Sequence, residues 1–229
     1  MKKIFFATAF AAASFVSHAQ FSIAPRIGFG ITDATISSKS GSTTTSYKSK
    51  NTLGFNVGAE VRYRLIDALS IHSGLFYQYL APKFEIKGGS STTTENIKLN
   101  YISLPIALVY GKREGFYGGA GINLAYGISG KVTGEYKDSD FPQDNETINV
   151  KIKFDGKKAA DATDGKAHLK GLNTGLILKA GYSFGNVFVG ADAIIGLSNL
   201  NPNSGSSFKT SSYGIHIGYV FGGGSSSAE

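Results

Sequence analysis

The chain has 229 residues, enough for one domain, with no cysteine and a net charge of +7 at pH 7. Without cysteine, a disulfide framework, a thiolate metal site and an acylated lipoprotein anchor are all excluded. The positive charge is spread over predicted loops rather than clustered, which argues against nucleic acid as a partner. Thirty glycines, 12 tyrosines and 16 phenylalanines accompany a mean hydropathy near zero (−0.04), as expected when apolar and polar residues alternate.

We predict that the two ends of the chain lie outside the folded domain. Residues 1–19 have the features of a secretory signal peptide: two lysines, an apolar run over residues 4–16, and small residues at positions 17 and 19. The mature chain would begin at Gln20, and no later stretch is long enough for a transmembrane helix. Residues 222–229 are rich in Gly and Ser, and we predict a flexible C-terminal tail there.

A strand predicted over 21–32 is followed by a Ser/Thr/Lys-rich loop over 36–50. The clearest pattern comes next. Every odd position from Leu53 to Leu65 is apolar, and every even position is Gly, Asn, Glu or Arg, a strict period of two. A three-residue turn, Ile66–Ala68, leads to a strand over 69–79 with the same alternation.

The middle of the chain continues this scheme. A polar loop over 87–95 precedes a strand over 98–110, in which Pro105 predicts a bulge because proline cannot donate to a ladder. A short turn over 111–115 leads to a strand over 116–133. The longest loop, 134–167, contains an alternating stretch over 147–154, so the barrel strands are expected to extend there as a hairpin.

The last third supplies three more strands. They are predicted over 168–184, 187–198 and 209–221. Gly185-Asn186 predicts a two-residue hairpin turn between the first two, and a polar loop over 199–207 separates the last two.

Eight strands result, with short turns after the second, fourth and sixth and long loops after the first, third, fifth and seventh. This pattern predicts an all-β, eight-stranded antiparallel up-and-down transmembrane β-barrel over residues 20–221, exported to the bacterial outer membrane with its long loops outside. We expect a monomer that contacts outer-membrane lipid and the phosphates of lipopolysaccharide. The alternative is a soluble barrel of the lipocalin type with its apolar face inside; the signal peptide, loop asymmetry and glycines on the polar face favour the membrane barrel.

The polar face would then line the lumen, which eight strands leave just wide enough for side chains. Charges there must pair with one another, so we predict a polar plug in its lower half. Counting from the turns sets Lys179 opposite Asp192 and Arg62 opposite His72. The upper half is expected to be lined by Gly, Ala, Ser and Asn. The predicted plug consists of Arg26, Glu60, Arg62, His72, Lys179, Asp192 and His216.

Little in the chain suggests chemistry. His168, with Asp161 and Asp164 nearby, is the best catalytic candidate, although a solvated loop histidine is the commoner explanation. The acidic segment 138–144 lacks the spacing of an EF-hand loop, and no helix follows the glycine-rich stretches to hold a phosphate. We therefore assign no catalytic, cofactor-binding or metal-binding residue and expect no cofactor.

Three stretches carry a family resemblance: Asn100–Tyr110, Gly175–Phe184 and the closing Tyr219-Val220-Phe221. They resemble the small outer-membrane β-barrel family widespread in Bacteroidetes, which includes the PorT-like proteins. The resemblance implies the same barrel fold; its PorT branch is linked to protein secretion and gliding. No matched residue has a chemical role, so none is transferred.

These features predict a non-enzymatic barrel that acts through its outer loops or with a protein partner in an envelope or secretion complex. Two alternatives remain open: a small-solute, porin-like channel, and an outer-membrane enzyme acting on lipid.

Overall fold

A computed structural model describes residues 20–222. The predicted signal peptide (1–19) and tail residues 223–229 lie outside this range; Gly222, also assigned to the tail, instead pairs with Ser22. Two short 3₁₀ helices, η2 (Pro142–Asp144) and η3 (Ala159–Asp161), interrupt the strands. No helix within residues 20–222 is long and apolar enough to cross a membrane. The strands are β1 (Phe21–Ser40), β2 (Thr43–Lys48), β3 (Thr52–Ile66), β4 (Leu69–Leu80), β5 (Lys83–Gly88), β6 (Ser91–Gly111), β7 (Gly115–Asp138), β8 (Glu146–Lys153), β9 (Ala167–His168), β10 (Leu172–Phe184), β11 (Val187–Gly196), β12 (Ser206–Tyr219) and β13 (Phe221–Gly222).

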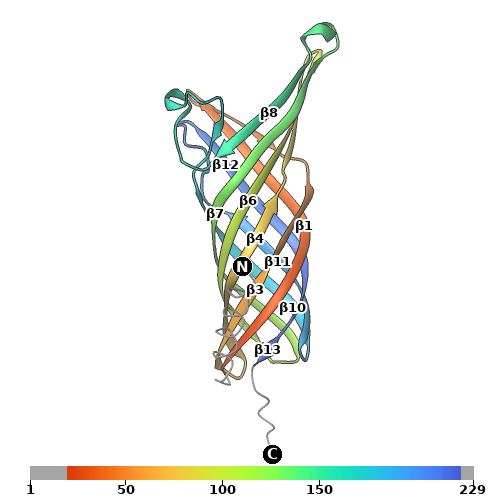
Figure 1. Ribbon diagram of the computed structural model, residues 1–229, viewed down its shortest axis with the longest axis vertical. Helices are drawn as coiled ribbons and strands as arrows, with labels where there is room; N and C mark the ends of the chain where they lie inside the picture. Colours follow the sequence, from red (N-terminus) through yellow and green to blue (C-terminus); the bar gives the residue numbers. More distant parts are fainter. Residues whose placement is uncertain (1–19, 223–229) are drawn as a thin grey trace, which may run out of the picture.

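Eight of these strands close into a ring. In the order β1, β3, β4, β6, β7, β10, β11 and β12, each pairs antiparallel with the next, and β12 returns to β1. The strands tilt around a barrel that is much taller than wide (Figure 1). The predicted eight-stranded antiparallel barrel is therefore confirmed.

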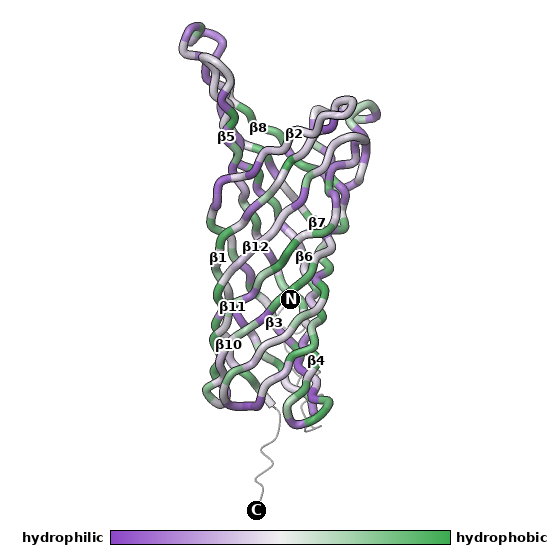
Figure 2. Tube along the Cα trace, turned by 180° about the vertical axis from the view of Figure 1, so that it is seen from behind, coloured by the Kyte–Doolittle hydropathy of each residue, from purple (hydrophilic) through white to green (hydrophobic). Residues whose placement is uncertain are grey.

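The outside of the ring is apolar, and charged side chains of the barrel strands lie inside. Phe29, Ile122 and Leu178, which face outward, are 58%, 47% and 50% exposed. Glu60 and Lys179, which face the lumen, are 1% and 5% exposed. Hydrophobic and hydrophilic residues follow one another along the barrel strands, as the green and purple segments of Figure 2 show. The lipocalin alternative is wrong for this chain, because it would place the apolar face inside.

The short turns lie together at one end, which we call the short end. Gly185-Asn186 forms the predicted two-residue turn, with Phe184 opposite Val187 and Gly185 at a φ of +66° that suits glycine. The turn between β3 and β4 is shorter than predicted, since Ile66 pairs with Leu69. A bulge between Arg64 and Ile66 absorbs the extra residue, and the predicted register beyond it is kept.

The bulge predicted at Pro105 is not there. Pro105 pairs in register with Asn123 of β7, and the β6–β7 bulge lies at Asn100/Tyr101 instead. On the other side of β6, the ladder to β4 runs to Ser73↔Ile106 and resumes in the same register at Phe76↔Ser103. The strand thus accommodates the missing N–H of proline by a gap in one ladder, without adding a residue.

At the opposite, long end, segments predicted as loops are strands. β1 continues to Ser40 and pairs with β2, within the predicted loop 36–50. β5 and the start of β6 form a hairpin across the predicted loop 87–95. The hairpin expected over 147–154 is confirmed, because β8 pairs with β7. Among them, β2 is rich in threonine and exposed along its whole length, so no apolar period marks it, although threonine favours strands.

Four neighbouring strands rise above the ring as one sheet, β5–β6–β7–β8, which we call the projecting sheet. Its β7–β8 connection, which carries η2, forms the tip that stands furthest from the barrel (Figure 1).

Candidate functional site: the charged layer and its two neighbouring cavities

The barrel brings the seven lumen residues together from six different strands. Inward-facing positions of β1, β3, β4, β10, β11 and β12 supply them because alternation turns every second side chain to the lumen. Arg26, Glu60, His72, Lys179 and His216 are buried. We call the seven residues the charged layer.

Glu60 lies at the centre of the first group. Lys179 reaches it from β10, which stands diametrically opposite β3 in the ring, and donates from Nζ to Glu60 Oε2. Arg62 donates from Nε to Glu60 Oε1 at 2.8 Å, and His72 Nδ1 lies 3.0 Å from the same oxygen. The carboxylate thus meets three nitrogen groups where it is 1% exposed.

Asp192 lies at the centre of the second group. Arg26 donates from Nη1 to Asp192 Oδ2, and His216 Nδ1 lies 3.5 Å from that oxygen. The predicted register, with Lys179 opposite Asp192, is confirmed. The ionic partner of Lys179 is nevertheless Glu60 across the lumen, because Arg26 occupies Asp192.

Three aromatic residues that were not part of the predicted plug complete the layer. Arg26 stacks over the ring of Phe76 at 4.4 Å and Arg62 over Phe188 at 4.0 Å. The Tyr117 hydroxyl lies 3.2 Å from Nε2 of His216. The alternation along their strands already turns these three side chains toward the lumen, beside glycines or charges. Large rings are nevertheless unexpected in a polar lumen.

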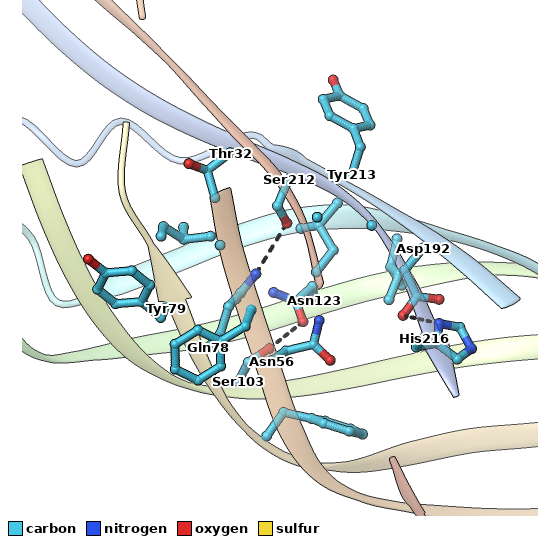
Figure 3. A pocket seen from close by; sticks show the side chains of 18 of the residues that line it. Thr32, Asn56, Gln78, Tyr79, Ser103, Asn123, Asp192, Ser212, Tyr213 and His216 are labelled. Atoms are coloured by element: carbon cyan, nitrogen blue, oxygen red, sulfur yellow. Dashed lines mark hydrogen bonds and ion pairs between the residues drawn. The ribbon is translucent and has the colours of Figure 1, made fainter. Parts of the chain in front are cut away.

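The charged layer separates two cavities. The upper cavity, about 40 Å³, is bordered by Arg26, Asp192 and His216. Two hydrogen bonds join residues that line it (Figure 3): Ser103 of β6 donates to Asn123 of the neighbouring β7 at 2.7 Å, and Gln78 of β4 donates to Ser212 of β12 at 3.2 Å.

The lower cavity, about 90 Å³, opens toward the short end and is bordered by Arg62, His72 and Tyr117. Glu60 and Lys179 border neither cavity. Each volume holds a few water molecules rather than a solute.

The long end of the lumen differs from the prediction. Instead of Gly, Ala, Ser and Asn alone, large apolar side chains gather there, which we call the apolar cap. Phe154 lies against Tyr101 with ring centroids 5.5 Å apart, and directly over Gly127, where a Cβ would come within 2.2 Å of its ring. The cap contains Ala34, Leu80, Phe84, Ile97, Leu99, Tyr101, Ala125, Ile152, Leu200 and Phe208, with Phe154 packed against them.

His168 belongs to the short strand β9, between β8 and β10, where it pairs with Lys153 of β8. Its Nδ1 is 2.7 Å from Asp155 Oδ1 and its Nε2 is 3.0 Å from Asp164 Oδ1, while Asp161 makes no hydrogen bond to it. Both contacts raise the pKa of His168, that to Asp155 most. Lys153 Nζ, 2.6 Å from Asp164, is the main cause that lowers the pKa of that carboxyl, with His168 second.

The His168 cluster lacks the arrangement of a catalytic base. Both ring nitrogens are held by carboxylates, so neither is turned toward a hydroxyl nucleophile. In the part of the chain that the structure describes, this cluster included, no group of three or more His, Cys, Asp or Glu side chains is placed to hold a metal ion.

Comparison with known proteins identifies the family. Residues 12–202 match the family described as "Outer membrane protein beta-barrel domain". No curated protein matches the chain. The family match covers most of the sequence, so the chain belongs to this family and is a protein of the bacterial outer membrane.

Several solved structures resemble the barrel at low sequence identity. Ail, the attachment invasion locus protein of Yersinia pestis, is 15% identical, with 88% of this chain and 99% of that chain covered and a TM-score of 0.37. Neisserial surface protein A is 14% identical, with 88% and 97% covered and a TM-score of 0.42. OprG from Pseudomonas aeruginosa is 14% identical, with 89% and 96% covered and a TM-score of 0.40. At this identity the likeness concerns the fold alone.

Proposed function

We propose that this member of the outer-membrane β-barrel family is a non-enzymatic, monomeric barrel with a plugged lumen, acting through its extracellular end on a protein partner in an envelope complex. Short turns face the periplasm in bacterial barrels, so the long end with the projecting sheet would face outward. The observation that carries the proposal is the charged layer, in which the Lys179–Glu60 ion pair spans the lumen between the opposite strands β10 and β3, and Arg26 of β1 pairs with Asp192 of β11.

The energetics of the layer support a closed lumen. A through-path would require Lys179 to leave Glu60, and separating a buried pair costs about 3–5 kcal/mol when a charge is left uncompensated. The apolar cap adds a second obstruction at the long end, where Phe154 packs on Tyr101.

The hydrogen bonds on both ring nitrogens of His168 support a non-enzymatic role rather than a role as a lipid-modifying enzyme. A general base needs one nitrogen free to accept a proton from its substrate or nucleophile. Here Asp155 and Asp164 take both positions.

Planar-bilayer recording tests the plug. We expect no steady channels from the refolded barrel, either intact or with the tip segment 139–145 replaced by a short turn. Steady channels that persist after this replacement would refute the plug and favour the porin-like alternative.

Co-purification tests the extracellular site of action. Proteins extracted with the barrel from its native membrane in mild detergent are compared between the wild type and the variant with the shortened tip. A matched control carries Lys112→Gln in a turn at the short end. A partner lost only from the tip variant is expected; a partner lost only from the control would place the interaction on the periplasmic side.

A further inference from the structure

Three lysines lie side by side on the outer face at the base of the projecting sheet. Lys98 of β6 is directly opposite Lys131 of β7, and Lys131 is directly opposite Lys151 of β8. Directly opposed residues on antiparallel strands share a face with their Cβ atoms about 5 Å apart. The three side chains, which we call the lysine row, therefore place three positive charges within roughly 10 Å.

The face of the row follows from its neighbours in register. Gly130 and Ile152, one residue along from Lys131 and Lys151, pair with each other, and Ile152 is buried in the apolar cap. Because successive side chains alternate, the row points away from the lumen. Lys98 and Lys151 are exposed and Lys131 is half-buried.

The row has no internal counter-charge. Like charges directly opposite one another on a sheet are destabilising. Higher on the same face, Lys137 and Lys87 are compensated by Glu135 and Glu85 at 2.7 and 3.3 Å. Within residues 20–222, none of the ion pairs involves the lysine row, so its charge is available to an external anion.

The height of the row matches a membrane interface. Tyr126 and Ile128 of β7 are exposed on the apolar outer band. On β6 this band reaches Ile102, four residues below Lys98. At about 3.3 Å per residue and a tilt near 40°, the backbone of the row stands roughly 10 Å above the end of the band. Lysine stems can bend over that distance and place their ammonium groups among lipid headgroups.

We propose that the lysine row binds the phosphoryl groups of the glycolipid in the outer leaflet, the lipid A part of lipopolysaccharide. Three ammonium groups in a row complement a headgroup that carries more than one phosphate, while the apolar band beside Tyr126 receives its acyl chains. The site would fix lipid at the base of the projecting sheet and orient that sheet above the membrane.

The test measures lipid binding to the barrel in zwitterionic detergent. Lipid A bearing two phosphates is titrated, and the lipid-bound fraction is read by native mass spectrometry. The variant Lys98→Gln/Lys131→Gln/Lys151→Gln removes the row. The control Lys39→Gln/Lys157→Gln/Lys158→Gln removes the same charge from exposed positions at the long end. A lysine at a membrane surface is worth about fivefold in affinity, so we expect the row variant to bind at least tenfold, and up to roughly a hundredfold, more weakly.

Binding measurements with other anionic ligands identify which kind of anion the lysine row recognises. We expect monophosphoryl lipid A to bind more weakly than the diphosphoryl form to the wild type, and this difference to shrink in the row variant. An equal loss in the row and control variants would overturn the proposal. Equal binding of phosphatidylglycerol would overturn it too, because any anionic lipid would then suffice. Tighter row-dependent binding of a soluble polysulfated oligosaccharide than of lipid A would assign the row to a soluble polyanion instead.

A purely protective role for the lysines has a different signature. Lysines on strand edges discourage pairing between molecules. In that case the row variant would self-associate while its affinity for lipid A equalled that of the control variant, and the proposal would be refuted.

Discussion

Glu60→Gln is expected to destabilise the barrel more when Lys179 is present than when it is absent. Glu60 is the ionic partner of Lys179, whose side chain is 2% exposed. Glutamine would leave that ammonium buried without a counter-charge, which costs about 3–5 kcal/mol. Lys179→Met costs less, because Glu60 keeps Arg62 and His72 as partners.

The double variant measures the interaction energy between Glu60 and Lys179. Removing both partners leaves no unpaired ammonium at position 179, so Glu60→Gln/Lys179→Met should be more stable than the two single changes predict by about 2–3 kcal/mol. Asp192 provides the matched control, because it lies directly opposite Lys179 in register but pairs with Arg26. The cycle of Lys179→Met with Asp192→Asn should show coupling below about 1 kcal/mol, the usual size for opposed residues on a sheet.

The assay is reversible urea unfolding of the barrel in phospholipid vesicles. The chain contains no tryptophan, so far-ultraviolet circular dichroism is the appropriate signal. A larger coupling energy for the pair with Asp192 than for the pair with Glu60 would refute the ion pairing across the lumen.

Two further predictions concern the long end. Protease added to intact cells is expected to cut within 139–145 and to spare the Asp67-Ala68 turn; cleavage at that turn instead would mean that the barrel is inverted. The raised pKa of His168 means that its hydrogen bonds to Asp155 and Asp164 stabilise the connection fully below the ordinary histidine pKa of 6.5, and that this contribution disappears as the pH rises through the raised value. Hydrogen exchange of residues 155–166, corrected for intrinsic rates, should therefore be slower at pH 6 than at pH 8.5 in the wild type; the same pH difference in a His168→Gln variant would contradict this role.

The sequence by itself determined the eight strands of the ring and which of their charged side chains face the lumen. Alternation with a period of two is a local property, so Glu60 and Lys179 could be placed inside without knowledge of their neighbours. The Gly185-Asn186 turn fixed the register of the strands it joins, including Lys179 opposite Asp192, because a two-residue turn leaves no freedom in pairing.

Some strands left no signal in the sequence. β2, at the long end, is rich in threonine and exposed along its whole length, so no apolar period distinguishes it from a loop. The apolar cap also escaped prediction. Phe84 and Phe154 come from segments outside the ring strands, but most of the cap, including Leu99 and Tyr101, comes from inward-facing positions of the ring strands near the long end.

Only the tertiary structure decided how the charges pair. Lys179 has Asp192 beside it in register, yet it binds Glu60, which lies 119 residues away along the chain. Ring closure places β3 and β10 on opposite sides of a lumen narrow enough for their side chains to meet. Local register gives the neighbours along the wall, whereas contacts across the lumen depend on ring closure. In the closed ring Asp192 pairs with Arg26, and Lys179 pairs with Glu60.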